Sequence, residues 1–126
     1  MQSVMRVLLI DDHDDFRTTI ADALIDYDIE VDGLASAEDA LVLLAAGQIP
    51  DVLVTDISLG PGLDGMDLAD MARARHPGVE IVFISGSPSN AQGRALDRHE
   101  RFVRKPFTVK QLIGAIRAAA GSEPTS

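Results

Sequence analysis

Three short, predominantly apolar runs constrain the fold of this chain more than any other feature of its sequence. They cover residues 6–10, 51–56 and 79–84. Apolar residues on consecutive positions indicate strands that are buried on both faces, as in parallel sheets covered by helices. In open α/β sheets of this kind, ligands bind beyond the carboxyl ends of the strands. The residues that close the runs are therefore the first candidates for a functional site.

The segments between these runs have the periodicity and the end signals of amphipathic helices. Ser36 with Asp39, and Thr108 with Gln111, match the capping-box pattern that starts a helix. The predicted helices cover residues 14–27, 36–47, 66–76 and 108–119, with a further short or irregular helix within 88–101.

Two weaker strands complete the pattern. Ile29 and Val31 alternate with charged residues, which is typical of an edge strand that is covered on one face only. Residues 102–104 form a brief last strand. Five alternations of strand and helix predict a parallel sheet with helices on both of its faces.

The length of the chain is that of one domain. At 126 residues it can bury roughly two-thirds of the surface that its unfolded form exposes. We expect a single domain over residues 1–126, with an ordered core at about 6–120 and a frayed tail at 121–126. The absence of cysteine excludes a disulfide framework and a thiolate metal site.

The charge of the chain narrows the choice of partners. The net charge of -9 comes from 20 acidic against 11 basic residues, which argues against nucleic acid or an anionic membrane surface. No stretch reaches the 18 or more consecutive apolar residues of a membrane span, and the first residues lack the pattern of a secretion signal. We therefore expect a soluble, cytoplasmic protein.

Polar side chains with complementary chemistry close four of the five predicted strands. They are Asp11, Asp12, Asp56, Ser85 and Lys105. Two carboxylates a few ångströms apart repel by roughly 4 kcal/mol at an effective dielectric constant near 20, so this group needs a divalent cation. Oxygen ligands without a nearby histidine or cysteine favour magnesium, with manganese as the alternative.

Phosphoryl transfer to an aspartate is the chemistry that suits this set of residues. Asp56 would attack phosphorus in line, while the cation and Lys105 neutralise the equatorial oxygens and Ser85 hydrogen-bonds one of them. Taken alone, Asp56 is explained equally well as the first residue of a turn. The ordered set favours the functional interpretation.

The same residues make the chain similar to the receiver domain of bacterial response regulators, the acceptor half of two-component signalling. The resemblance covers residues 6–119. It rests on Asp11-Asp12, Asp56, Asp64-Gly65, Ser85 and Lys105-Pro106-Phe107 in that order. It implies a flavodoxin-like (βα)5 fold, a doubly wound parallel sheet with strand order 2-1-3-4-5. The donor that it implies is a phosphohistidine on a histidine kinase or a histidine phosphotransfer protein.

The resemblance also implies a role for each residue. Asp56 becomes the phosphoacceptor, with Lys105 and Ser85 at the phosphoryl group. The implied magnesium ligands are Asp11, Asp12, Asp56 and the backbone carbonyl of Ser58. Ser85 and Phe102 become a switch pair, and the peptide bond before Pro106 is expected in cis. No organic cofactor is implied, and the chemistry concerns the chain's own aspartyl phosphate instead of turnover of a substrate.

Two features depart from the commonest receiver pattern. The turn at residues 58–65 is one residue longer than usual, and the interval from Ser85 to Lys105 is shorter. Both are similar to receivers that are attached to, or work beside, hybrid histidine kinases. We expect the output to pass through contact with a downstream protein target, and a homodimer is a further state that the sequence allows.

Three other interpretations compete with this one. Gly60, Gly62 and Gly65 satisfy the G-x-G-x-x-G spacing of a dinucleotide loop, but this turn follows the third strand instead of the first. Asp12 and Asp14 have the D-x-D spacing of small aspartyl-phosphate phosphatases, for which the chain is short. The third interpretation is a pseudo-receiver that binds its partners without phosphorylation.

The remaining titratable residues give weaker signals. His13, His76 and His99 have no metal-ligand spacing, and we expect all three at the surface. Asp14 and Asp15 are expected as helix-start charges, because the helix dipole favours acidic groups there.

Overall fold

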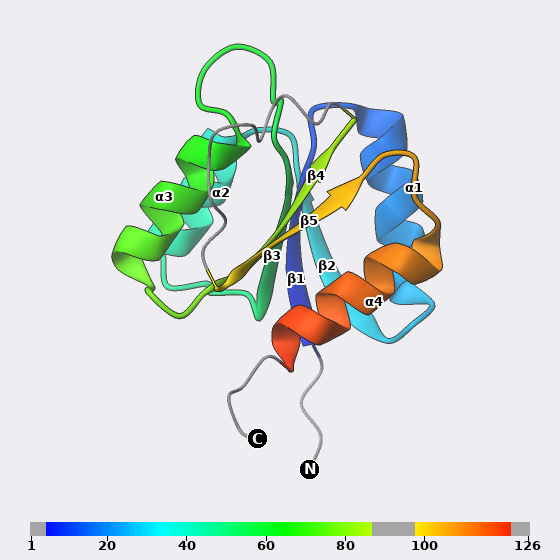
Figure 1. Ribbon diagram of the computed structural model, residues 1–126. Helices are drawn as coiled ribbons and strands as arrows, with labels where there is room; N and C mark the ends of the chain where they lie inside the picture. Colours follow the sequence, from blue (N-terminus) through cyan, green and yellow to red (C-terminus); the bar gives the residue numbers. More distant parts are fainter. Residues whose placement is uncertain (1–4, 87–97, 122–126) are drawn as a thin grey trace.

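The three apolar runs form the centre of one parallel sheet, ordered β2-β1-β3-β4-β5 (Figure 1). The strands are β1 (Met5–Ile10), β2 (Ile29–Leu34), β3 (Val52–Asp56), β4 (Glu80–Ser85) and β5 (Glu100–Arg104). The computed structural model describes residues 5–86 and 98–121. The predicted strand order is confirmed, and so is the edge position of the second strand.

Four helices within the described residues cover the sheet. They are α1 (Asp14–Ile25), α2 (Ala37–Ala45), α3 (Gly65–Arg75) and α4 (Val109–Ala120). In Figure 1, α2 and α3 lie on one side of the sheet and α1 and α4 on the other, as a doubly wound fold requires. None of these helices is both long and apolar enough to cross a bilayer.

Strand alternation divides the core into two layers, since successive side chains point to opposite faces of a sheet. Leu8 and Ile10 of β1 pack with Phe83 of β4 in the layer beneath α2 and α3. Val7 and Leu9 of β1 pack in the layer beneath α1 and α4. Because apolar layers pack against both faces of the sheet, the positions of the ends of the central strands are fixed.

Side-chain caps fix the starts of two predicted helices. The Ser36 hydroxyl oxygen accepts a hydrogen bond of 3.1 Å from the Asp39 backbone N–H. Thr108 and Gln111 form a complete capping box, in which each side chain accepts from the other residue's backbone N–H. The first helix begins at Asp14, as its periodicity predicts.

The last strand begins earlier than the sequence predicts. It starts at Glu100 instead of Phe102, and Glu100 pairs with Ile81 of β4. The Glu100 carboxylate is fully buried and forms an ion pair with Arg73 of α3, which also contacts Asp70 at 2.9 Å. A charged residue can lie in a sheet when its charge is paired in this way. The sequence-based prediction left Glu100 out of the strand because glutamate is polar.

Two predictions fall mainly on residues outside the described ranges. The irregular helix predicted within 88–101 is one of them. Of that segment, residues 98 and 99 form a turn and Glu100 opens β5. The frayed tail predicted at 121–126 is the other, since only Gly121 of that tail is described.

The close approach of Gly65 to the end of β3 gives a stability prediction. A Cβ atom at Gly65 would lie 2.2 Å from the Asp56 carbonyl oxygen and 2.9 Å from the Ile57 Cα. Both are backbone atoms, so the strand end would have to move. We expect Gly65→Ala to lower the free energy of unfolding by about 3 kcal/mol, at the upper end of overpacking costs, in urea denaturation.

Gly114→Ala is the matched control. A Cβ atom at Gly114, in the interior of α4, meets nothing within 4 Å. Alanine should raise the free energy of unfolding there by about 0.5–1 kcal/mol through its higher helix propensity. Equal losses in the two variants would contradict the assignment of a steric role to Gly65.

Candidate functional site

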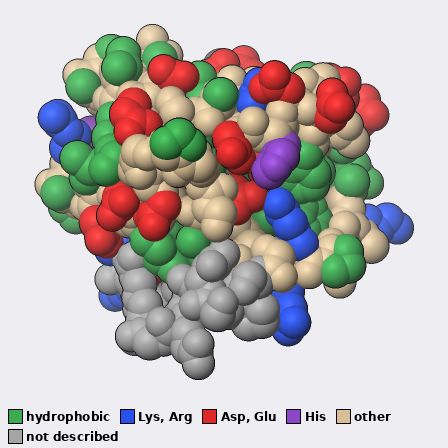
Figure 2. Space-filling model, turned by 90° about the horizontal axis from the view of Figure 1, so that it is seen from above, with side chains coloured by type: hydrophobic (Ala, Val, Ile, Leu, Met, Phe, Trp, Pro, Cys, Tyr) green, Lys and Arg blue, Asp and Glu red, His purple; other side chains and the backbone are tan. Residues whose placement is uncertain are grey.

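The sequence-predicted site residues lie at one edge of the sheet because the strands are parallel. Thr55 of β3 pairs with Ile10 of β1, and Ser85 of β4 pairs with Arg104 of β5, so all four strands end together. Figure 2 views the molecule from this end, where acidic side chains gather with a histidine and a basic side chain beside them. The topology therefore brings together Asp11, Asp12, Asp56, Ser85 and Lys105.

Asp56 is the most constrained carboxylate of the site. It closes β3 and is only 5% exposed. Its Oδ2 accepts a hydrogen bond of 2.8 Å from the Lys105 Nζ, and its Oδ1 accepts one of 3.0 Å from the Ser58 backbone N–H. Each carboxylate oxygen therefore has a separate donor, which fixes the orientation of the side chain.

The Lys105 ammonium also contacts one aromatic ring, that of Phe16. Its Nζ lies 4.6 Å from the centroid of the Phe16 ring, within the range of a cation–π interaction of roughly 0.5–2 kcal/mol. The Phe16 ring meets Phe107 edge-on, with centroids 6.0 Å apart and planes at 79°. The Lys105–Pro106 peptide bond is cis. The sequence places Phe16 only on the apolar stripe of a helix and so misses its contact with Lys105.

Asp11 is buried more deeply than any other acid of the site, at 1% exposed. Its Oδ1 accepts a hydrogen bond of 2.8 Å from the His13 backbone N–H, whereas its Oδ2 has no hydrogen-bond partner within the described part of the chain. Burial raises the pKa of Asp11 above its ordinary value of 3.8, and the Asp56 charge adds to this. The His13 amide and the Lys105 ammonium lower the pKa of Asp11 and so offset part of that rise.

Asp12 and His13 line the more open side of the site. The Asp12 side chain is 33% exposed, and its Oδ2 lies 3.2 Å from the place where a Cβ atom of Gly60 would stand. The turn after β3 therefore passes directly beside Asp12. The His13 ring is 71% exposed, as expected of a surface residue, yet its Nδ1 lies 3.3 Å from an oxygen of Asp11 and 3.3 Å from one of Asp12.

The turn between β3 and α3 is fixed at both of its ends. The Leu63 backbone N–H donates to Glu38 Oε2 of α2 at 3.1 Å, and the Gly65 backbone N–H donates to the Ile57 carbonyl at 2.8 Å. Asp64 forms a complete capping box with Asp67 at the start of α3, which the sequence does not reveal because the capping residue is an aspartate instead of a serine or threonine. The turn thus keeps Ser58 beside Asp56.

Ser85 and Phe102 lie on adjacent strands and face the same side of the sheet. Phe83 pairs with Phe102 and Ser85 pairs with Arg104, so Phe102 is two residues from the register partner of Ser85. Ser85 is 1% exposed, and its carbonyl oxygen accepts a hydrogen bond of 2.8 Å from the Lys105 backbone N–H. Phe102 is partly buried against the layer beneath α2 and α3.

The donor set fits a hard divalent cation. Asp11 contributes a buried carboxylate oxygen that has no hydrogen-bond partner among the described residues, and Asp12 contributes an exposed carboxylate directly after it. Buried polar atoms are nearly always paired, so the Oδ2 of Asp11 calls for a positive ligand. Carboxylate and backbone carbonyl oxygens are the ligands that magnesium prefers.

Comparisons with known proteins identify one family. Residues 7–117 match the family model described as the response regulator receiver domain. The chain is 33% identical over 115 residues to the sensor kinase CckA of Brucella abortus (strain 2308), covering 88% of this chain but only 12% of that kinase. It is 28% identical over 123 residues to the chemotaxis protein CheY of Listeria monocytogenes, covering 93% of this chain and 99% of that protein.

A solved structure has the same fold throughout. The response regulator receiver protein from Sinorhizobium medicae WSM419 superposes with a TM-score of 0.86 at 29% sequence identity. The superposition covers 94% of this chain and 95% of that chain. The chain also spans only 24% of the nitrogen assimilation regulatory protein NtrX of Azorhizobium caulinodans, to which it is 32% identical over 110 residues.

The raised pKa of Asp11 predicts how stability depends on pH in the metal-free protein. A raised pKa means that the folded state holds the proton more tightly than the unfolded state. The stability that protonated Asp11 contributes is therefore fully present below pH 3.8 and is lost as the pH rises through the folded-state pKa. In EDTA at neutral pH, we expect Asp11→Asn to be more stable than the wild type in urea denaturation.

The difference in the free energy of unfolding between Asp11→Asn and the wild type should disappear as the pH falls toward about 4, where wild-type Asp11 regains its proton. Asp15→Asn is the control, because Asp15 is an exposed acid in the first turn of α1. It should not stabilise the protein at either pH. A gap between Asp11→Asn and the wild type that does not depend on pH would contradict the titration of Asp11 as its cause.

Proposed function

The chain belongs to the response regulator receiver family, and we propose that Asp56 accepts a phosphoryl group from a phosphohistidine. The observation that carries this proposal is the ion pair of 2.8 Å between Asp56 and Lys105 at the end of a buried strand. It holds a nucleophilic carboxylate beside a cation that can neutralise an incoming phosphoryl group. Signalling, instead of substrate turnover, is the role that this family membership supports.

The proposed phosphoryl transfer uses the side chains of Asp56, Lys105 and Ser85. One oxygen of Asp56 attacks phosphorus, the bond between phosphorus and the donor imidazole nitrogen breaks, and that nitrogen keeps the electron pair and takes a proton from water. Lys105 then contacts an oxygen of the phosphoryl group instead of the free carboxylate. The Ser85 hydroxyl, at the end of the neighbouring strand, hydrogen-bonds a second oxygen and moves together with Phe102.

Magnesium is the cation that we assign to this site. Asp11, Asp12, Asp56 and the backbone carbonyl of Ser58 would hold it. When bound, the ion neutralises charge that the carboxylates and the phosphoryl oxygens would otherwise place side by side. Manganese is the alternative ion, since carboxylate and carbonyl oxygens suit both magnesium and manganese.

The phosphatase alternative lacks its second carboxylate. Asp14, the later residue of the D-x-D pair, is exposed and forms an ion pair of 2.7 Å with Arg17 on the surface of α1. A general acid must reach the substrate, whereas this carboxylate is engaged outside the site. The geometry therefore favours a phosphoacceptor over a turnover phosphatase.

The partners that we propose are proteins. Similarity to a sensor kinase, of which the chain spans only 12%, supports a histidine kinase or a histidine phosphotransfer protein as the donor. The longer turn after Asp56 supports the same association with hybrid kinases. The net charge of -9 favours a basic surface on the downstream protein target over nucleic acid or membrane. Phosphorylation would change this target contact or promote a homodimer in the cytoplasm.

Phosphorylation of Asp56 is tested by intact mass. Incubation of the protein with acetyl phosphate and magnesium should add the mass of one phosphoryl group to the wild type. Asp56→Asn keeps the shape of the side chain and removes the nucleophilic charge, so it should gain none. Asp15→Asn is the matched control and should gain the group as the wild type does. An equal gain in Asp56→Asn would refute the assignment of the acceptor.

Magnesium binding is tested by thermal unfolding. An ion that binds only the folded state at ten times its Kd stabilises it by about 1.4 kcal/mol, which raises the Tm of a domain of this size by several degrees. Asp12→Ala should abolish the rise, whereas Asp15→Ala should retain it. If Asp12→Ala responded to magnesium as the wild type does, Asp12 would not be a ligand.

A further inference from the structure

We propose that His13 adds a nitrogen ligand to the carboxylates of Asp11 and Asp12, and that these three residues bind a zinc-class divalent ion in competition with magnesium. The binding of zinc stands on the geometry of the three side chains alone. Its effect on phosphorylation rests on the proposed function of Asp56.

The two distances from the His13 nitrogen to the carboxylate oxygens are those expected between ligands of a tetrahedral centre. The His13 Nδ1 lies 3.3 Å from the Asp11 Oδ1 and 3.3 Å from the Asp12 Oδ1, and each of the three residues offers a ligand atom within 4.8 Å of those of the other two. Two ligands that are each 2.0–2.1 Å from one tetrahedral ion stand about 3.3 Å apart. An ion of this class therefore fits with little movement of the side chains.

The burial of Asp11 is a second observation that points to a cation, and it concerns the Oδ2 of Asp11, not the Oδ1 that faces His13. The side chain of Asp11 is 1% exposed, and its Oδ2 has no hydrogen-bond partner within the described residues. Leaving a buried carboxylate oxygen without a partner costs free energy, and a bound cation removes that cost. The buried charge of Asp11 thus favours the binding of a cation, and the imidazole of His13 determines which class of cation binds.

The backbone holds the imidazole in place without using its nitrogens. His13 is the residue before the first turn of α1, and its side chain makes no capping hydrogen bond. Its backbone N–H donates to the Asp11 Oδ1 at 2.8 Å, which folds the three consecutive residues onto one another. Since the ring is 71% exposed, water can complete the coordination of an ion there.

The nitrogen ligand decides the class of ion. Imidazole suits zinc, copper and nickel, whereas magnesium takes oxygen ligands and gives up its water reluctantly. Zinc would use Asp11 and Asp12, which the proposed magnesium site also needs. The two ions would therefore exclude each other, and zinc should slow the phosphorylation of Asp56.

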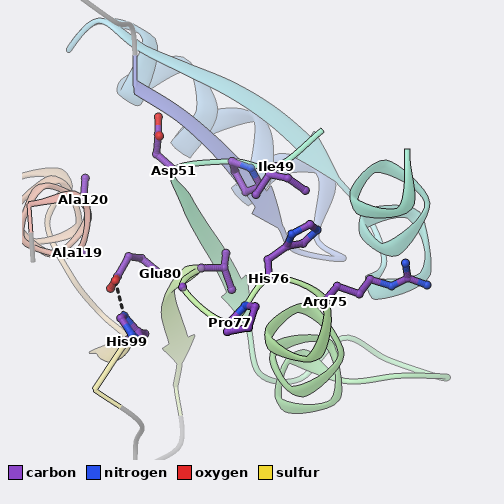
Figure 3. Close-up of a pocket in the computed structure, with 12 residues that line it drawn as sticks. Ile49, Asp51, Arg75, His76, Pro77, Glu80, His99, Ala119 and Ala120 are labelled. Carbon is purple, nitrogen blue, oxygen red and sulfur yellow. Dashed lines mark hydrogen bonds and ion pairs between the residues drawn. The ribbon is translucent and has the colours of Figure 1, made fainter. Parts of the chain in front are cut away.

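The other described histidines lack this arrangement. His76 and His99 line a cavity of about 550 Å³ at the amino ends of β3 and β4, where Figure 3 shows them well apart. His99 Nδ1 lies 2.6 Å from Glu80 Oε2, at the far end of the sheet from Asp56. Within residues 5–86 and 98–121, Asp11, Asp12 and His13 are the one group of three ligating side chains.

Isothermal titration calorimetry with zinc chloride or magnesium chloride tests the proposal directly. His13→Ala should weaken zinc binding by about tenfold or more, because even the loss of groups that only support a ligand costs about that much. The same variant should keep its magnesium affinity within about twofold, since magnesium has no need of the imidazole. His76→Ala is the matched control and should bind both ions as the wild type does.

Either of two results would overturn the proposal. One is an unchanged zinc affinity in His13→Ala, and the other is an equal loss of zinc and magnesium affinity. Circular dichroism melting of the apo variant checks its fold, which the retained backbone bond to Asp11 should preserve. Zinc should also slow the gain of phosphoryl mass in the wild type more than in His13→Ala. If the wild type gains no phosphoryl group but zinc binding depends on His13, the phosphoacceptor proposal fails while this one stands.

Discussion

The ion pair between Asp56 and Lys105 is the interaction on which the arrangement of the site depends. It joins the ends of β3 and β5, which are separated by β4 in the sheet. The Asp56 side chain is 7% exposed and the Lys105 side chain 29%, so desolvation offsets much of the attraction between the two charges. The pair is therefore better understood as a means of placing two opposite charges than as a source of stability. The Phe16 ring supports the same placement from α1.

The acids around this pair show why the fold must supply stability elsewhere. The Lys105 ammonium alone cannot neutralise the carboxylates of Asp11, Asp12 and Asp56. Burial therefore raises the pKa of Asp11, because the negative charge of Asp11 is only partly compensated. The two apolar layers on either side of the sheet hold these groups together against their repulsion. A site that is strained without its ion binds that ion more tightly, since binding relieves the cost.

The sequence predicts the fold well because the strands and helices follow from periodicity, and the predicted site residues lie at one edge of the sheet, while their roles stay predictions. Continuous apolar runs locate the central strands, and their polar ends identify Asp56 and its neighbours. Contacts that depend on tertiary structure cannot be predicted from this periodicity. Glu100 enters β5 only because Arg73 reaches it from α3. His13 has no recognisable ligand spacing, because three consecutive residues converge only when the backbone N–H of His13 folds back onto Asp11.

The turn after Asp56 shows how a misleading motif is resolved by its hydrogen bonds. Gly60 and Gly62 have φ of 78° and 95°, so glycine serves the backbone of the turn there. A dinucleotide loop would offer the helix N-terminus to a pyrophosphate, but Asp64 already caps α3 with its own carboxylate. The backbone N–H of Ser58 instead donates to Asp56. Because Asp64 occupies the N-terminus of α3, the phosphoryl transfer that we propose relies on Lys105 and on the proposed cation to neutralise the incoming anion.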